Sequence, residues 1–126
     1  MKIPLAICAV AEAATGLALL GFAPIVIKLL FGAEIAGFGI LLSRFAGICL
    51  IALGVACWPS GEPKQALRAM LVYNLLVTPY FVYLGLGGKW VGVLLWPAAA
   101  AHAILAILLA WAWLSDRNRM TRERAL

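Results

Sequence analysis

Charge is what this sequence has least of. Only 12% of its 126 residues are charged, and just five residues are Asp or Glu. Soluble domains carry about 25% charged and about 45–50% apolar residues, whereas 66% of this chain is hydrophobic. A chain of this length cannot bury so much apolar surface in its own core, because small domains leave much of their area exposed. The composition excludes an ordinary soluble domain and indicates a single membrane domain over residues 1–126.

Metal-ligating and redox-active residues are also scarce, with one histidine and three cysteines. Cys8, Cys49 and Cys57 lie in apolar runs and form no C-x-x-C pair, which is typical of small packing residues. A haem or copper site would need further ligands besides a single histidine. We therefore expect no metal, no cofactor and no catalytic residue, which favours a non-enzymatic protein.

Four stretches are long and apolar enough to cross a bilayer, which takes about 20 mostly apolar residues. We place helices near residues 3–23, 38–58, 67–86 and 90–114, followed by a basic tail at 115–126. Pro24 is a good first residue for a new helix, so residues 24–31 should form a short interfacial helix. Because the connections are short, the fold class is an all-α membrane protein, an up-down bundle of four transmembrane helices.

The basic residues indicate how the bundle is oriented, since Lys and Arg are enriched in cytoplasmic loops. Seven of them belong to the amino end, the second loop and the tail, namely Lys2, Lys64, Arg68, Arg117, Arg119, Arg122 and Arg124. Only Lys28 and Lys89 belong to the opposite side. We expect both termini to be cytoplasmic, with the tail contacting anionic lipid headgroups rather than nucleic acid.

Ionisable groups inside a span are costly and are the first candidates for function. At 1.5 Å per residue, Glu12 lies about 13 Å, Asn74 about 10 Å and His102 about 13–18 Å from the inner ends of their helices. The three can therefore share one intramembrane polar cluster. It would either handle protons or orient a ligand, or it would simply join helices by hydrogen bonds. Arg44 starts about 9 Å from the outer end of its helix and should snorkel outward, in the direction of Glu34.

Small and kinking residues indicate how the helices pack. Small side chains recur at helical spacing at Ser43, Gly47, Ala99, Ala103 and Ala106. Such faces let helices approach closely, either within this chain or against another subunit. Pro79 and Pro97 should kink their helices, and kinked helices can frame a cavity.

Three strings of the sequence look like those of small bacterial membrane proteins without an established activity. They are Ala11-Glu-Ala-Ala-Thr-Gly-Leu17, Arg44-Phe-Ala-Gly-Ile-Cys-Leu-Ile-Ala-Leu-Gly-Val-Ala-Cys-Trp-Pro59 and Leu95-Trp-Pro-Ala-Ala-Ala-Ala-His102. Their four-helix layout is similar to that of the broad DoxX-like group. The resemblance implies a bundle in a bacterial inner membrane and adds nothing on mechanism.

Three functions follow as hypotheses. The first is a non-enzymatic bundle that self-associates or joins a larger membrane complex and holds a lipid or apolar ligand. The second is a proton-linked channel or transporter using Glu12 and His102. The third is a membrane redox component.

Overall fold

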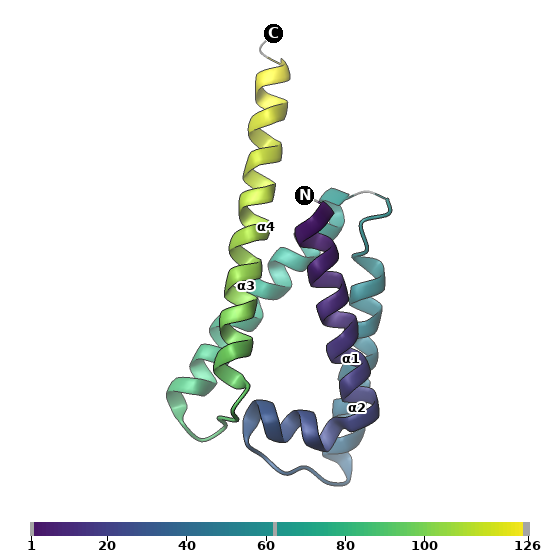
Figure 1. The fold of residues 1–126 in the computed structure, drawn as a ribbon, viewed down its shortest axis with the longest axis vertical. Helices are drawn as coiled ribbons and strands as arrows, with labels where there is room; N and C mark the ends of the chain where they lie inside the picture. Colours follow the sequence, from purple (N-terminus) through teal and green to yellow (C-terminus); the bar gives the residue numbers. More distant parts are fainter. Residues whose placement is uncertain (1, 62, 125–126) are drawn as a thin grey trace.

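Four helices make up most of the chain in the computed structural model, which describes residues 2–61 and 63–124. They are α1 (Lys2–Phe31), α2 (Phe38–Ala56), α3 (Pro63–Gly87) and α4 (Leu95–Arg124), and the described residues form no strand (Figure 1). All four are long and apolar enough to cross a membrane. Large apolar side chains point outward along every helix, as expected where lipid covers the outer surface.

A sharp bend divides α1 into two parts. Phe22 leaves the helical region, with φ −134° and ψ 40°, and Pro24 follows two residues later. The bend is expected there because proline has no N–H to donate and its ring crowds the preceding turn. After the bend, residues 24–31 run across the lower part of the molecule toward α3 and α4 (Figure 1). We call residues 24–31 the crossing segment.

The other helix ends differ from the predicted bounds for local reasons. Pro63 begins α3 four residues early, at a position that proline favours. At Leu95, α4 begins five residues late, and it continues as one helix through the basic tail, whose Asp116 carboxylate lies 3.8 Å from the Lys64 ammonium. This late start puts Pro97 in the first turn of α4, where its missing N–H breaks no helical hydrogen bond, so the predicted kink has no basis there.

The helices pack as two pairs, α1 with α2 and α3 with α4. Glycines bring the first pair together: a Cβ atom on Gly16 would lie 2.5 Å from the Gly47 carbonyl oxygen, and one on Gly47 would lie 2.6 Å from the Gly16 carbonyl oxygen. A Cβ atom on Gly54 would similarly meet the Ala9 carbonyl oxygen at 2.6 Å. The backbones of α1 and α2 therefore touch at distances that only glycine permits.

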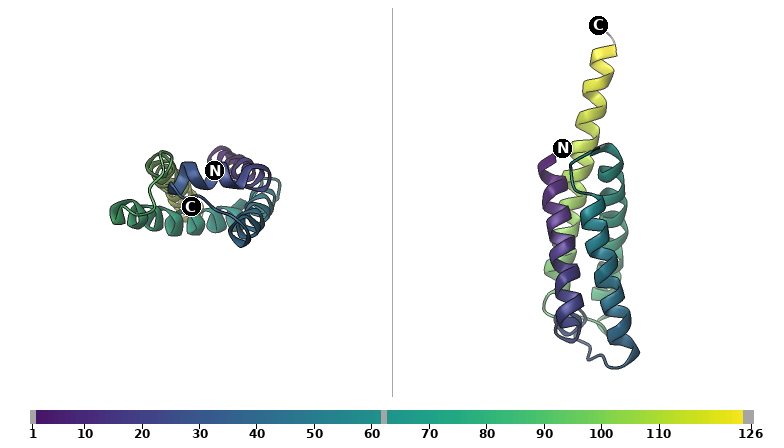
Figure 2. Two further views of the ribbon diagram at one scale, coloured as in Figure 1. Left: turned by 90° about the horizontal axis from the view of Figure 1, so that it is seen from below. Right: turned by 90° about the vertical axis from the view of Figure 1, so that its right-hand side faces the viewer.

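The two pairs meet at one end and separate toward the other (Figures 1 and 2). A buried apolar cluster joins them where they meet; its members are Leu5, Cys8, Ala9, Cys57, Leu67, Met70, Leu109 and Ala112. Over its whole length α1 has far fewer contacts with α3 and α4 than with α2. The crossing segment then spans the widened end, as the view from below shows (Figure 2). The two pairs thus diverge from the apolar cluster at one end toward the crossing segment at the other.

Candidate functional site

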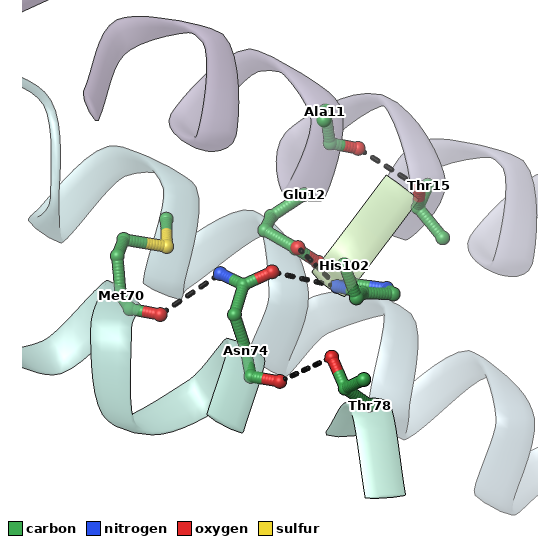
Figure 3. A network of polar contacts seen from close by, with 7 residues as sticks. All are labelled: Ala11, Glu12, Thr15, Met70, Asn74, Thr78 and His102. Atoms are coloured by element: carbon green, nitrogen blue, oxygen red, sulfur yellow. Dashed lines mark hydrogen bonds and ion pairs between the residues drawn. The ribbon is translucent and has the colours of Figure 1, made fainter. Parts of the chain in front are cut away.

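Three polar residues from three different helices come together just beyond the apolar cluster (Figure 3). The Nδ1 atom of His102 in α4 lies 2.8 Å from the Asn74 Oδ1 atom in α3 and 4.0 Å from the Glu12 Oε1 atom in α1. Asn74 is fully buried and Glu12 is 3% exposed. The structure thus brings together the three residues that helix depth placed in one layer.

The direction of the Asn74–His102 hydrogen bond follows from a second bond. The Asn74 side-chain amide donates to the Met70 carbonyl oxygen of its own helix at 2.8 Å, so its Oδ1 atom is left to accept. We therefore assign a proton to His102 Nδ1, which donates to Asn74. In a neutral imidazole the other ring nitrogen, Nε2, is then an acceptor.

The Nε2 atom of His102 faces open space. Every buried side-chain nitrogen and oxygen atom in the described residues has a hydrogen-bond partner. Nε2 has no such partner among them, so it cannot be one of the buried atoms. Nε2 is therefore not sealed in protein, and His102 lines the cavity between the helix pairs. Figure 3 shows one ring nitrogen turned toward Asn74 and Glu12 and the other turned away from them.

Aromatic rings hold the histidine in place. Tyr73 and Phe81 both meet the His102 ring edge-on, with centroid distances of 5.8 Å and 5.6 Å. The Tyr73 hydroxyl also interacts with the Glu12 carboxyl. Sequence reasoning missed Tyr73, although it lies one residue before Asn74 and its hydroxyl interacts with Glu12. A search for polar groups at the depth of Glu12 could have included it.

A cavity of about 990 Å³ lies between the helix pairs and includes this cluster in its wall. Its polar lining residues are Glu12, Thr15, Ser43, Tyr73, Tyr80 and His102, and the remaining lining residues are apolar. Thr15 and Ser43 donate their hydroxyl protons to carbonyl oxygens one turn back in their own helices. The polar groups left to meet a cavity occupant are therefore Tyr80 and, at the end nearest the apolar cluster, Glu12, Tyr73 and His102.

The crossing segment closes the far end of the cavity. The backbone N–H groups of Gly92 and Leu94 donate to the carbonyl oxygens of Leu30 and Leu29, at 2.9 Å and 2.8 Å. Phe31 packs edge-on against Phe81 with a centroid distance of 6.0 Å. A Cβ atom on Gly92 would collide with the Leu29 carbonyl group, so this closure requires glycine. The cavity therefore has an apolar end, formed by the crossing segment, and a polar end opposite to it, formed by Glu12, Tyr73 and His102.

Arg44 stays apart from the polar cluster and is exposed on α2. The suggested partner, Glu34, pairs instead with Lys28, whose Nζ atom lies 2.9 Å from the Glu34 carboxylate. This hydrogen bond, with the charge of Lys28, holds the pKa of the Glu34 carboxyl below its ordinary value. Both side chains are largely exposed.

The predicted small-residue positions face inward. Gly47 contacts α1 of the same chain, and Ser43 lines the cavity. Ala99 and Ala106 are buried, and Ala103 is half-buried. Packing within one chain thus accounts for these positions without a second subunit.

A scan of protein-family models, a search of curated proteins and a search of solved structures found no significant match to this chain. The resemblance to the DoxX-like group therefore stays an expectation from the sequence. Within residues 2–61 and 63–124, no three His, Cys, Asp or Glu side chains form a group that could hold a metal ion.

Proposed function

We propose that this protein is a membrane-embedded binding protein that takes a small apolar or amphipathic ligand into the cavity between its helix pairs. The cavity carries the proposal. Ligand sites are typically about 300–1,000 Å³ in volume, mostly apolar, and supplied with a few convergent polar groups. A volume of about 990 Å³, an aliphatic and aromatic lining, and the Glu12–Tyr73–His102 end agree with each of these features.

The membrane arrangement belongs to the same proposal. The four helices cross a bacterial inner membrane in up-down order with both termini in the cytoplasm, as the seven-to-two distribution of Lys and Arg favours. The crossing segment then lies along the outer interface as a short amphipathic element, with Lys28 and Glu34 near the headgroups. The cavity would open toward the outer half of the bilayer, and its polar end would sit near mid-membrane.

We also propose that the protein associates with a second copy of itself or with a larger membrane complex. The outward faces of α2 and α3 carry exposed apolar side chains such as Leu41, Phe45, Leu76 and Tyr83. Lipid or another protein can cover such faces. Because the small residues face inward, a second copy or another membrane protein would contact these larger, exposed side chains.

Proton-linked transport is a second candidate, and one observation favours it. Glu12 and His102 lie 4.0 Å apart, and both line a cavity rather than a sealed core. Two titratable groups that share a cavity can exchange protons with each other and with its occupant. Binding is the simpler proposal because transport also requires the cavity to open to both sides.

The proposal is tested by filling the cavity. Ala46 lines it from α2, whereas Ala52 on the same helix is exposed and lies outside its lining. The Ala46→Phe and Ala52→Phe variants would be purified in mild detergent, and native mass spectrometry would identify bound species. We expect Ala46→Phe to lose a species that the parent protein and Ala52→Phe retain. An unchanged set of bound species in Ala46→Phe would contradict the proposal.

Binding of 1-decanol provides a second measurement that does not depend on what co-purifies. Each protein would be placed in phosphatidylcholine nanodiscs, and decanol retention would be compared with that of empty nanodiscs. Decanol bound to the parent protein and to Ala52→Phe, and reduced in Ala46→Phe, is the expected result. Retention equal to that of empty nanodiscs in all three, for decanol and likewise for decylamine, would overturn the proposal.

A further inference from the structure

Hydrogen-bond acceptors dominate the polar end of the cavity. The His102 Nε2 atom is an acceptor because Nδ1 carries the ring proton toward Asn74. An ionised Glu12 carboxyl has two acceptor oxygens, and the Tyr73 hydroxyl and the His102 ring are both near it. The complementary ligand group is one that donates two or more hydrogen bonds from a single atom.

Charge narrows the ligand class further. Among residues 2–61 and 63–124, the cavity lining contains one carboxyl group, that of Glu12, and no Lys or Arg. A carboxylate without a counter-charge is costly inside a membrane, so Glu12 needs either a proton or a cation beside it. Aromatic faces attract cations, and Tyr73, Tyr80, Phe31 and Phe81 all line the same space.

From these observations we infer that the cavity binds a hydrophobic amine in its ammonium form, with the charged nitrogen beside the Glu12 carboxyl at the polar end and the apolar body among the aliphatic side chains. The inference rests on the proposed binding function and names its ligand class. A primary or secondary ammonium has at least two N–H groups, so it can donate to the Glu12 carboxylate and to a second acceptor at the polar end, where Nε2 is the acceptor without a partner among the described residues. Alcohols supply one donor and no charge, and carboxylates supply the wrong charge.

Binding would exchange a cation for a proton. Before binding, Glu12 is neutralised by its own proton; when the ammonium enters, that proton leaves and the cavity stays neutral. The other titratable groups that face Glu12 are Cys8 on its own helix, Tyr73 on α3 and His102 on α4, while the cavity-lining residues of α2 include none. Binding of the amine should therefore strengthen as the pH rises and release a proton into a weakly buffered solution.

Four probes with the same alkyl chain distinguish these requirements: decylamine, 1-decanol, decyltrimethylammonium and decanoate. In phosphatidylcholine nanodiscs we expect decylamine to bind about tenfold or more tightly than decanol, because charge-assisted hydrogen bonds are the stronger kind. Decyltrimethylammonium keeps the charge but has no N–H to donate, so it should bind more weakly than decylamine. Decanoate should not exceed its retention in empty nanodiscs.

Because the chain has one histidine, isotope-labelled histidine in protein without an affinity tag gives two unambiguous ring-nitrogen signals. Decylamine should shift the Nε2 signal as that atom accepts a hydrogen bond, while the Nδ1 signal stays in place. Glu12→Gln should remove the preference for decylamine over decanol. Thr15→Val is the matched control on α1, since the Thr15 hydroxyl also lines the cavity but donates to the Ala11 carbonyl oxygen, and it should keep the preference.

The outcomes separate this inference from the proposed function. If decanol binds as tightly as decylamine, or if Glu12→Gln keeps the amine preference, the inference is wrong and the cavity is a general apolar site. If neither probe exceeds its retention in empty nanodiscs, both the inference and the proposed function fail.

Discussion

Asn74 and His102 are joined across α3 and α4 by a 2.8 Å hydrogen bond whose direction is set by the backbone of α3. The side-chain amide nitrogen of Asn74 donates to the Met70 carbonyl oxygen at 2.8 Å, and its side-chain oxygen accepts from His102 Nδ1. The buried asparagine thereby fixes the tautomer and the orientation of the ring. If Asn74 only filled space, either orientation of its amide group would serve. The observed orientation requires a proton on Nδ1 of His102 and leaves Nε2 as an acceptor that faces the cavity.

Replacing Asn74 by leucine should release the ring. Interhelical hydrogen bonds in membranes are worth about 0.6 kcal/mol on average and about 1–2 kcal/mol in model peptides, so Asn74→Leu should lower stability by about 1 kcal/mol. The two ring-nitrogen signals of His102 should also change from one fixed tautomer to a mixture. Nitrogen NMR and unfolding in detergent mixtures measure these two effects.

Thr78→Val is the control for this experiment, because the Thr78 hydroxyl donates at 2.8 Å to the Asn74 backbone oxygen and not to its side chain. It should leave the tautomer unchanged. A single tautomer in Asn74→Leu would show that Tyr73 and Phe81 alone orient the ring, and that asparagine has no part in it.

Gly47, like Gly54, should be difficult to replace in α2. Its ideal Cβ position lies 2.6 Å from the Gly16 carbonyl oxygen, so any side chain forces α1 and α2 apart. Overpacking costs about 1–3 kcal/mol, and Gly47→Leu should lower stability by at least that amount. Ala52→Leu, on the exposed face of the same helix, should have little effect. Thermal unfolding in detergent compares the two, and equal stability would mean that α1 and α2 do not touch at the glycines.

Much of the fold could be predicted because lipid imposes simple rules. Twenty apolar residues make a span, and the helical rise converts position into depth. On that basis Glu12, Asn74 and His102 were expected in one layer, and the structure joins Asn74 to His102 at 2.8 Å. Inward packing of Gly47 also follows from its small size, although its partner Gly16 on α1 was not identified from the sequence.

The cavity could not be predicted, because it depends on relations that no single segment contains. Pro24 indicates a new helix, but only the tertiary structure shows that the bend lies at Phe22 and that residues 24–31 turn toward α4. The closing contact involves Gly92, whose requirement for glycine comes from the Leu29 carbonyl group far away in sequence. Tyr73 was missed for the same reason: its hydroxyl matters only because α1 brings Glu12 to it.

Reporter fusions test the proposed orientation. Seven Lys and Arg residues belong to the ends and the second loop, against two on the other side. Since positive charge is retained in the cytoplasm, a reporter fused after Leu126 should be active only in its cytoplasmic form. A reporter inserted near Gly87, at the carboxyl end of α3, should be active only in its periplasmic form. The reverse pattern would mean that the bundle is inserted the other way round.

Glu12→Leu separates a structural role of this carboxyl from a functional one. A carboxylate near mid-membrane costs about 2.5–3.5 kcal/mol on insertion scales, and the 4.0 Å approach to His102 is too long for a strong ion pair. Leucine has a similar volume and no charge, so the ligand-free variant should be as stable as the parent protein or more stable. Asn74→Leu, by contrast, should lose stability, because Asn74 is buried and its side-chain nitrogen and oxygen are both hydrogen-bonded.

The comparison decides what Glu12 is for. A residue that joins helices lowers stability when it is removed, whereas a residue kept for binding lowers only the binding. In thermal unfolding we expect Glu12→Leu to match or exceed the parent protein, and in nanodiscs to retain decanol but lose the preference for decylamine. If Glu12→Leu is instead destabilised as much as Asn74→Leu, then Glu12 joins α1 to α3 and α4 through Tyr73 and His102. In that case its presence in the cavity wall is a consequence of packing.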